Sequence, residues 1–176
     1  MKGLADRLAL ISDRIVAALG NLCGAIVLIM GFLILFEVLM RYVVGRPPLL
    51  ADELSRYMLV GMTFLGMSYV WKEKGHVRVE ALAMRLSKDK ANRLRMATLI
   101  VALVFVVILF VGSLDFIARS ISQNRTSDSW MRVPLVWPEL TIVVGFLLLA
   151  SQVATSIWRA IGIMKSGGAL EQEVSK

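Results

Sequence analysis

The stretch that decides the fold is Leu49–Trp71, with the sequence LLADELSRYMLVGMTFLGMSYVW. Its uncharged part begins only after Arg56 and is too short to cross a hydrocarbon core of about 30 Å, which needs about 20 mostly apolar residues. The stretch reaches that length only if the helix takes Asp52, Glu53 and Arg56 into its first turns. We therefore predict a membrane-spanning helix with a charged entrance.

Three longer apolar runs surround this stretch: Ile15–Phe36, Met96–Leu114 and about Pro134–Trp158. Pro134 and Pro138 suit the start of a helix, where a missing N–H costs nothing. The first run is longer than the apolar part of a signal peptide and lacks a small-x-small cleavage site, so we expect it to remain as a span. We predict an all-α membrane protein, one domain over residues 1–176, with four transmembrane helices at about 15–40, 50–71, 95–117 and 134–158.

The composition agrees with a membrane protein. Hydrophobic residues make up 57% of the 176 residues, above the 45–50% that is usual for soluble domains. The only cysteine, Cys23, and the only histidine, His76, allow no disulfide within the chain and no Cys/His metal site. We expect no cofactor, no metal and, because no catalytic motif is visible, no enzymatic activity.

The positive charges predict the orientation. Of the 20 Lys and Arg residues, fourteen flank the spans on the side of the two chain ends and six lie on the other side. Cytoplasmic loops carry the excess of Lys and Arg. We therefore predict an N-in/C-in membrane protein. Since topology explains the net charge of +7, we expect no binding of nucleic acid.

Two segments have the pattern of short amphipathic interfacial helices. Residues 2–14 lead into the first span with Leu4, Leu8 and Ile11 at helical spacing. Residues 76–93 carry an apolar stripe flanked by cations, which fits either a basic loop held by anionic phospholipid or a surface helix that docks on a partner. The connection Ser120–Val133 is polar and short, which indicates a loop. The tail from about residue 166 is predicted to be disordered.

Ionisable residues gather near the outer ends of the first two spans. Glu37 and Arg41 are four residues apart and share a helix face, and a second group follows the turn at Asp52, Glu53 and Arg56. A pair between helices, such as Glu37 with Arg56, is geometrically easy. Because the groups lie near the interface and not at mid-bilayer, we favour structural pairing or a subunit interface over ion coupling.

Small residues and a further charge pair complete the candidate set. Gly20, Gly24 and Gly31 line one face of the first span, and the first two form a small-xxx-small step that permits close helix approach. Asp115 and Arg119 are expected to pair at the end of the third span.

The order of motifs between residues 37 and 80 resembles a known family. The chain reads E-x3-R-Y-V-x-G-x-P from residue 37, ADELSRY from residue 51 and GHVRVE from residue 75. This resembles the small membrane subunit (DctQ-like, or Q subunit) of tripartite ATP-independent periplasmic (TRAP) transporters. That family often has Trp before the acidic pair, where this chain has Leu49 and Leu50. The residues that carry the resemblance are Glu37, Arg41, Tyr42, Pro47, Glu53, Arg56, Tyr57, Thr63, Gly66, Gly75, His76 and Arg78.

The resemblance implies a function, partners and a location in the bacterial inner (cytoplasmic) membrane. A subunit of this kind packs beside the large membrane subunit (M subunit) as a scaffold, while a periplasmic binding protein (P subunit) delivers a small carboxylate whose uptake a sodium gradient drives. We expect no functional homo-oligomer of this chain alone. The candidate structural or interface residues are Glu37, Arg41, Asp52, Glu53, Arg56, Gly20, Gly24, Gly31, His76 and Arg78.

Two rival interpretations have different requirements. A self-contained four-span transporter acting as a homodimer would need a carboxylate such as Glu37 at mid-bilayer, facing a cavity. A membrane anchor for a redox enzyme would need histidines at bilayer depth. The substrate itself cannot be identified from this chain.

Overall fold

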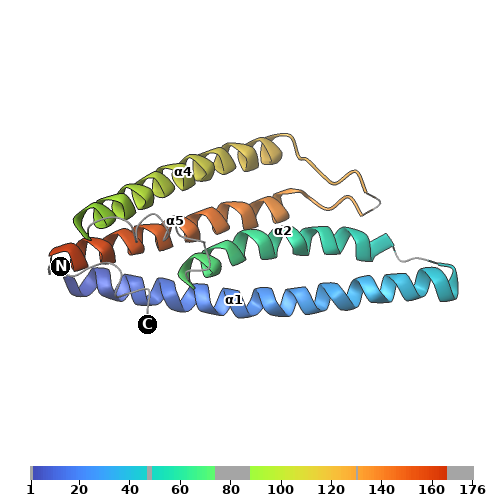
Figure 1. The fold of residues 1–176 in the computed structure, drawn as a ribbon. Coiled ribbons are helices and arrows are strands. Elements are labelled where there is room, and N and C mark those ends of the chain that lie inside the picture. The colour runs from blue at the N-terminus through green and yellow to red at the C-terminus, as the bar shows by residue number, and fades with distance from the viewer. Residues whose placement is uncertain (1, 47–48, 74–87, 130, 166–176) are drawn as a thin grey trace.

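A computed structural model describes residues 2–46, 49–73, 88–129 and 131–165, and most of them lie in long helices (Figure 1). In chain order these are α1 (Lys2–Leu39), the π-helical segment η1 (Met40–Val44), α2 (Leu49–Lys72), α4 (Lys88–Ser122) and α5 (Val136–Lys165). The described part of the chain contains no strand beyond one isolated bridge. The predicted all-helical class is therefore confirmed.

The helices stand in a row in the order α1, α2, α5, α4, which differs from their order in the chain (Figure 1). Extensive contacts join each helix to the next in this row, and a smaller contact joins α1 to α5. We call the end where α1 begins and α5 ends the terminal end, and the opposite end the turn end. The two middle helices, α2 and α5, run parallel, and each edge helix runs antiparallel to its neighbour.

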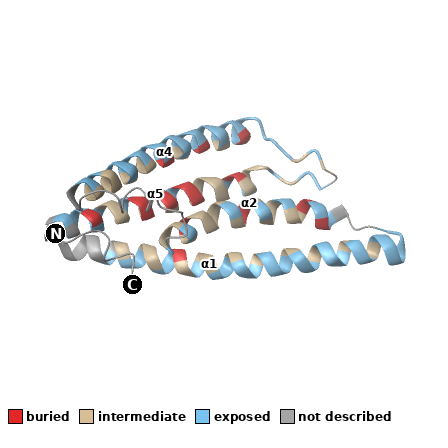
Figure 2. Ribbon diagram, viewed as in Figure 1, coloured by how far each residue is buried: buried red, intermediate tan, exposed pale blue. Residues whose placement is uncertain are grey.

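Burial follows this arrangement (Figure 2). A small core of Val106, Leu149 and Val153 lies between α4 and α5. In an 18-residue apolar window of each helix, 28% of the residues are buried in α5 but none in α1. The row is therefore one helix thick along much of its length, and its edges expose apolar side chains that water would not solvate well.

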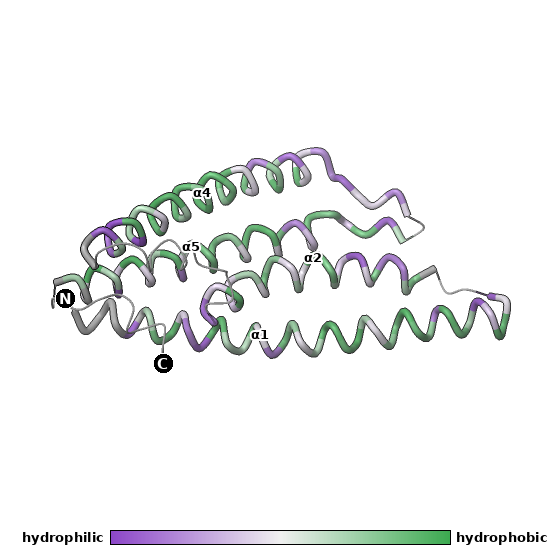
Figure 3. Tube along the Cα trace, in the orientation of Figure 1, coloured by the Kyte–Doolittle hydropathy of each residue, from purple (hydrophilic) through white to green (hydrophobic). Residues whose placement is uncertain are grey.

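Three helical segments are long and apolar enough to cross a membrane: Ala9–Val44, Lys90–Ser122 and Val136–Gly162. Apolar residues predominate along these segments, with a few polar residues among them (Figure 3). This confirms a multi-pass membrane protein. Helix α2 has 24 residues, about 36 Å of helix, but its first turns carry the three charged residues of the predicted entrance. That α2 is a fourth crossing, and that both termini lie inside, stay predictions.

Backbone chemistry explains where the helices end at the turn end. Gly45 has a left-handed φ of 71° and donates its N–H to the Met40 carbonyl, which closes η1. Glycine adopts this conformation at no steric cost, so it commonly ends helices. Pro138 lies in the first turn of α5, where no intrahelical N–H bond is lost.

The two middle helices approach one another closely at Gly145 of α5. A Cβ atom there would lie 2.5 Å from the Phe64 carbonyl oxygen of α2. Beside this contact, the rings of Phe64 and Phe146 pack edge to face with centroids 5.4 Å apart. The absence of a side chain at Gly145 is thus what lets α2 and α5 pack at this distance.

The connection between α4 and α5 is more ordered than the predicted loop. Ser127 donates its backbone N–H to the Val133 carbonyl at 2.9 Å, and Leu135 donates to the Arg125 carbonyl at 3.1 Å. A bridge between Thr126 and Pro134 lies between these bonds. Residues 123–135 therefore form a small hairpin at the turn end, with Trp130 outside the described residues.

The predicted interfacial segments have different outcomes. Residues 2–14 continue without a break into the first span, since α1 begins at Lys2. Most of the segment 76–93 lies outside the described residues, as does the tail from 166, and residues 88–93 form the first turns of α4. Whether either segment rests on a membrane surface stays a prediction.

Candidate functional site

The charged residues predicted near the ends of the first two spans form two ion pairs, each between residues four apart on one continuous helical segment. Arg41 pairs with Glu37, and Arg56 pairs with Asp52 at 2.6 Å. In the described structure the four groups therefore do not form the expected link between helices through Glu37 and Arg56. The reason is geometric, because a partner four residues away on the same helix is reached without ordering a second element.

Glu53 behaves differently from its charged neighbours because it is 7% exposed. The Tyr57 hydroxyl donates to its carboxylate at 2.7 Å. The Ser129 hydroxyl in the hairpin also acts as a hydrogen-bond donor to Glu53, and the Ser127 hydroxyl donates to Ser129 at 2.9 Å. The carboxylate thus connects the start of α2 to the hairpin between α4 and α5, and sequence spacing gave no sign of this contact.

A second buried carboxylate joins α4 to α5 at the same end. Ser120 donates its hydroxyl to Glu139 at 2.7 Å, and both residues are buried. The other carboxylate oxygen of Glu139 has no hydrogen-bond partner among the described residues. The sequence pattern predicts only that Glu139 lies near the start of a helix. The signal that could have found the contact is that Ser120 and Glu139 flank one short connection at equal depth.

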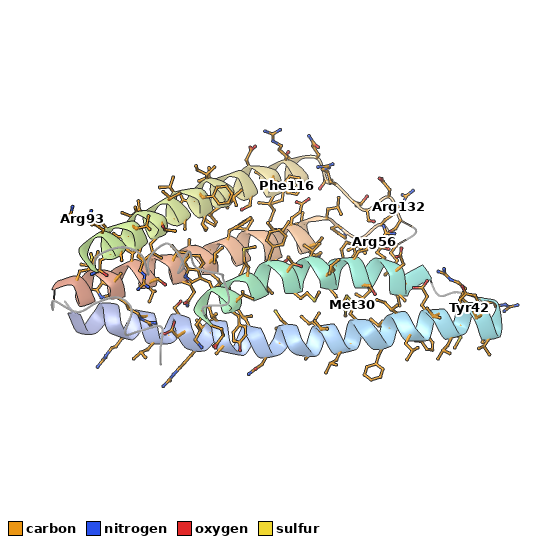
Figure 4. All side chains as sticks on the ribbon, in the orientation of Figure 1. Met30, Tyr42, Arg56, Arg93, Phe116 and Arg132 are labelled. Carbon is orange, nitrogen blue, oxygen red and sulfur yellow. The ribbon has the colours of Figure 1, made fainter. Side chains whose placement is uncertain are left out.

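The turn end also carries the predicted pair on α4. Arg119 binds Asp115 through two nitrogen atoms, at 2.7 and 3.1 Å, and both side chains are exposed. This confirms the expected pair. Arg56 and Arg132 also extend from the turn end (Figure 4).

The terminal end contains polar contacts between α1 and α5 that sequence analysis missed. Arg159 pairs with Asp13 at 2.5 Å. Gln152 donates to the Ser12 hydroxyl at 2.9 Å, and the hydroxyls of Ser12 and Ser151 lie 3.2 Å apart. These residues are about 140 positions apart in the chain, so no local pattern reveals their pairing.

The last turn of α2 joins the same end of the row. The Trp71 indole nitrogen donates to the Ser156 hydroxyl of α5 at 3.2 Å. Ser68, which is fully buried, bonds to the Leu65 carbonyl of its own helix. The bond between Trp71 and Ser156 joins α2 to α5, and the contacts of Arg159 and Gln152 join α5 to α1. Together they connect three helices at the terminal end.

The three candidate glycines do not share one environment. A Cβ at Gly20 would lie 2.4 Å from the ring of Tyr69, whereas a Cβ at Gly24 or Gly31 would meet nothing within 4 Å. Gly20 therefore provides the close approach of α1 and α2 that the sequence pattern predicts. The space at Gly24 and Gly31 is open. His76 and Arg78 lie outside the described residues.

The chemistry of these groups is that of structural contacts. The acidic residues of the described helices lie toward the helix ends, and Asp13, Glu37, Asp52, Glu53, Asp115 and Glu139 bind arginine or hydroxyl groups. The described residues contain no group of three or more His, Cys, Asp or Glu side chains that could hold a metal ion.

Comparison with known proteins gives two findings. The family model of the DctQ component of tripartite ATP-independent periplasmic transporters matches residues 30–162, most of the chain. A protein of Haemophilus influenzae (strain ATCC 51907 / DSM 11121 / KW20 / Rd), provisionally described as a TRAP transporter small permease protein, is 29% identical over 96 residues. That match covers 54% of this chain and 60% of the relative, so the chain spans less than two thirds of the relative's length.

Proposed function

The chain belongs to the DctQ component family of tripartite ATP-independent periplasmic transporters, and on that premise we propose that it is a scaffold subunit beside the large membrane subunit. Family membership makes it a component of a TRAP transporter. The observation that supports the scaffold role is the row of helices itself. Both edges expose large apolar residues, and the charged residues are used at the ends of the row for pairing.

The proposed topology has four crossings with both termini in the cytoplasm. The length of α2 and its packing between α1 and α5 support a crossing, and the excess of Lys and Arg at the terminal end supports the orientation. Reporter fusions at the C-terminus of the full chain test this. A reporter that fluoresces only in the cytoplasm should be fluorescent, and alkaline phosphatase fused at the same position should be inactive. The reverse pattern would refute the proposed orientation.

The proposed transport reaction is sodium-driven uptake of a small carboxylate delivered by a periplasmic binding protein. Its support is the resemblance to the family, since the described residues contain no candidate site for the substrate. Reconstitution of this chain with the large subunit and the binding protein in liposomes tests the proposal. Uptake of a carboxylate should need a sodium gradient and all three proteins. Uptake that continues without this chain would refute its role.

The partner is tested by co-expression with a large TRAP membrane subunit. A tag on either protein should purify both in a fixed ratio. If this chain purifies alone as a stable dimer that transports in liposomes, the alternative of a self-contained homodimeric transporter is correct and the subunit proposal is wrong.

Glu37→Gln sharpens the same test. The side chain of Glu37 is only 13% exposed and pairs with Arg41. Its charge is therefore part of an ion pair at the turn end and not of a site at mid-bilayer. We expect the substitution to lower the yield of the complex more than it changes the sodium dependence of uptake. A fully assembled complex with altered sodium stoichiometry would contradict this role.

A further inference from the structure

We propose that the outward face of α1, the face opposite α2, binds a membrane-spanning helix of the large TRAP subunit, while the outward face of α4 contacts lipid. This inference rests on the proposed function and assigns the interface to one edge of the row. The outward face of α1 is defined by residues seven apart, which lie on one line of a helix. These are Arg7, Arg14, Asn21, Leu28 and Leu35.

The opposite side of α1 is already occupied. Val16 is fully buried, the Cys23 thiol approaches the Met62 carbonyl of α2, and Met30 points toward α2 (Figure 4). On the outward face, by contrast, Leu28 is 66% exposed and Phe32 is 71% exposed. Nothing in the described structure covers this face.

Asn21 is the residue that distinguishes this face from one made for lipid. It lies within the uncharged first span, about 10 Å along the helix from Arg14. Its side-chain amide is exposed and has no hydrogen bond to any described residue. Lipid tails offer an amide no partner, and such groups in membranes characteristically bond to a neighbouring helix. Asn21 therefore favours a protein on this face.

Gly24 and Gly31 both lie C-terminal to Asn21, on the same half of the helix as its exposed amide. A Cβ at either position would meet nothing in this chain within 4 Å. Gly24, one turn from Asn21, allows another helix to approach closely and bring a polar side chain within reach of the amide. Gly31 extends the open space about two turns further along the helix. The open space at these glycines would thus admit the neighbouring helix that the Asn21 amide needs as a hydrogen-bond partner.

The outward face of α4 has a different composition. Its most exposed residues are Val101, Phe105 and Ile108, at 67%, 60% and 62%. Thr98, near the start of the apolar stretch, bonds to the Leu94 carbonyl of its own helix and needs no partner. Gly112 on this face is open as well, since a Cβ there would meet nothing within 4 Å, so open glycines alone do not distinguish the two edges. The difference is that the α4 face shows large aliphatic and aromatic side chains, which suit lipid tails, and no counterpart of the free Asn21 amide among its described residues.

Charge argues that the occupant of the α1 face is not a second copy of this chain. Two copies in one membrane would meet around a two-fold axis, so that each residue of the face lies near its own equivalent. Arg7 and Arg14 would then face the same cations of the partner, and these arginines have no ion pair among the described residues. A different helix with an acidic or polar terminal end avoids this repulsion.

Photo-crosslinking tests the assignment with matched positions. The photoreactive residue p-benzoylphenylalanine replaces either Phe32 or Phe105, both exposed phenylalanines on opposite edges, in the chain co-expressed with the large subunit. We expect the Phe32 position to give an adduct with the large subunit and the Phe105 position to give at least tenfold less. An adduct mainly from Phe105, or a dimer of this chain from Phe32, would overturn the proposal.

Substitutions provide a second measurement. Gly24→Leu combined with Gly31→Leu fills the open space, and Asn21→Leu removes the amide; Val104→Leu on α4 is the control. We expect at least a tenfold loss of co-purified large subunit for the α1 variants at an unchanged membrane level of this chain, and no loss for the control. Equal recovery from all variants would refute the interface on α1.

These outcomes separate the two proposals. If the unsubstituted chain fails to purify with the large subunit, the proposed function is wrong. If it does purify with that subunit but crosslinks from Phe105, the function stands and only the assignment to α1 fails. Should an α1 variant not accumulate, the phenylalanine positions still decide, because that replacement fills no internal space.

Discussion

The charged residues at the two ends of the row form ion pairs in different ways, within one helix at the turn end and between two helices at the terminal end. At the turn end, Arg41 and Arg56 pair within their own helices. At the terminal end, Arg159 of α5 pairs with Asp13 of α1. A pair within one helix stabilises that helix but holds no neighbour in place, whereas a pair between helices restricts their relative position. Helix α1 is therefore fixed at its terminal end and held at its turn end mainly by packing against α2.

The largest expected effect comes from filling the close contact between α1 and the end of α2. Gly20→Ala places a methyl group 2.4 Å from the Tyr69 ring, which must move, and such overpacking costs about 1–3 kcal/mol. Gly31→Ala enters open space and should change stability by no more than about 0.5 kcal/mol. The loss of monodisperse protein on heating in detergent measures both. Equal effects would contradict the difference between the two glycines.

The next effect concerns ion pairs between and within helices. A double-mutant cycle with Asp13→Ala and Arg159→Ala should give a coupling of about 1 kcal/mol, because Asp13 is only 18% exposed but Arg159 is 43% exposed. The same cycle on Asp52 and Arg56, both largely exposed, should give about 0.3 kcal/mol. A larger coupling at the turn end would reverse the comparison.

The smallest effect is a difference in mobility, measured by distances between spin labels. Labels at Leu10 and Ile161 report on the terminal end, and labels at Leu39 and Leu140 report on the turn end, all on exposed positions of α1 and α5. In a Cys23→Ala background, we expect the turn-end distances to have the broader distribution when this chain is alone. A broader distribution at the terminal end would show that the pair of Asp13 and Arg159 does not fix α1.

Local sequence patterns predicted much of the fold but little of the packing. Runs of apolar residues predicted the helices. A spacing of four residues between opposite charges predicted the pairs of Glu37 with Arg41 and of Asp115 with Arg119. The row order could not be predicted, because it depends on which apolar faces meet. Each helix exposes apolar residues on several sides, so periodicity does not single out a neighbour.

The candidate site shows the same division. Gly20 was predicted to permit close packing and does so against Tyr69, but the role of Gly24 and Gly31 differs because α2 does not cover them. The contacts of Glu53 with the hairpin and of Ser120 with Glu139 depend on how α4 and α5 fold beside α2. Contacts of this kind are long-range in the chain and leave no local signal.

The order of the helices has a consequence for biogenesis. The pairs α1–α2 and α4–α5 are each neighbours both in the chain and in space, so each can insert and close as a unit while synthesis continues. The seam between α2 and α5 is completed only when α5 has emerged, and at Gly145 it accepts no side chain. An error at this last seam would therefore leave two helix pairs, α1–α2 and α4–α5, each formed but not joined to the other.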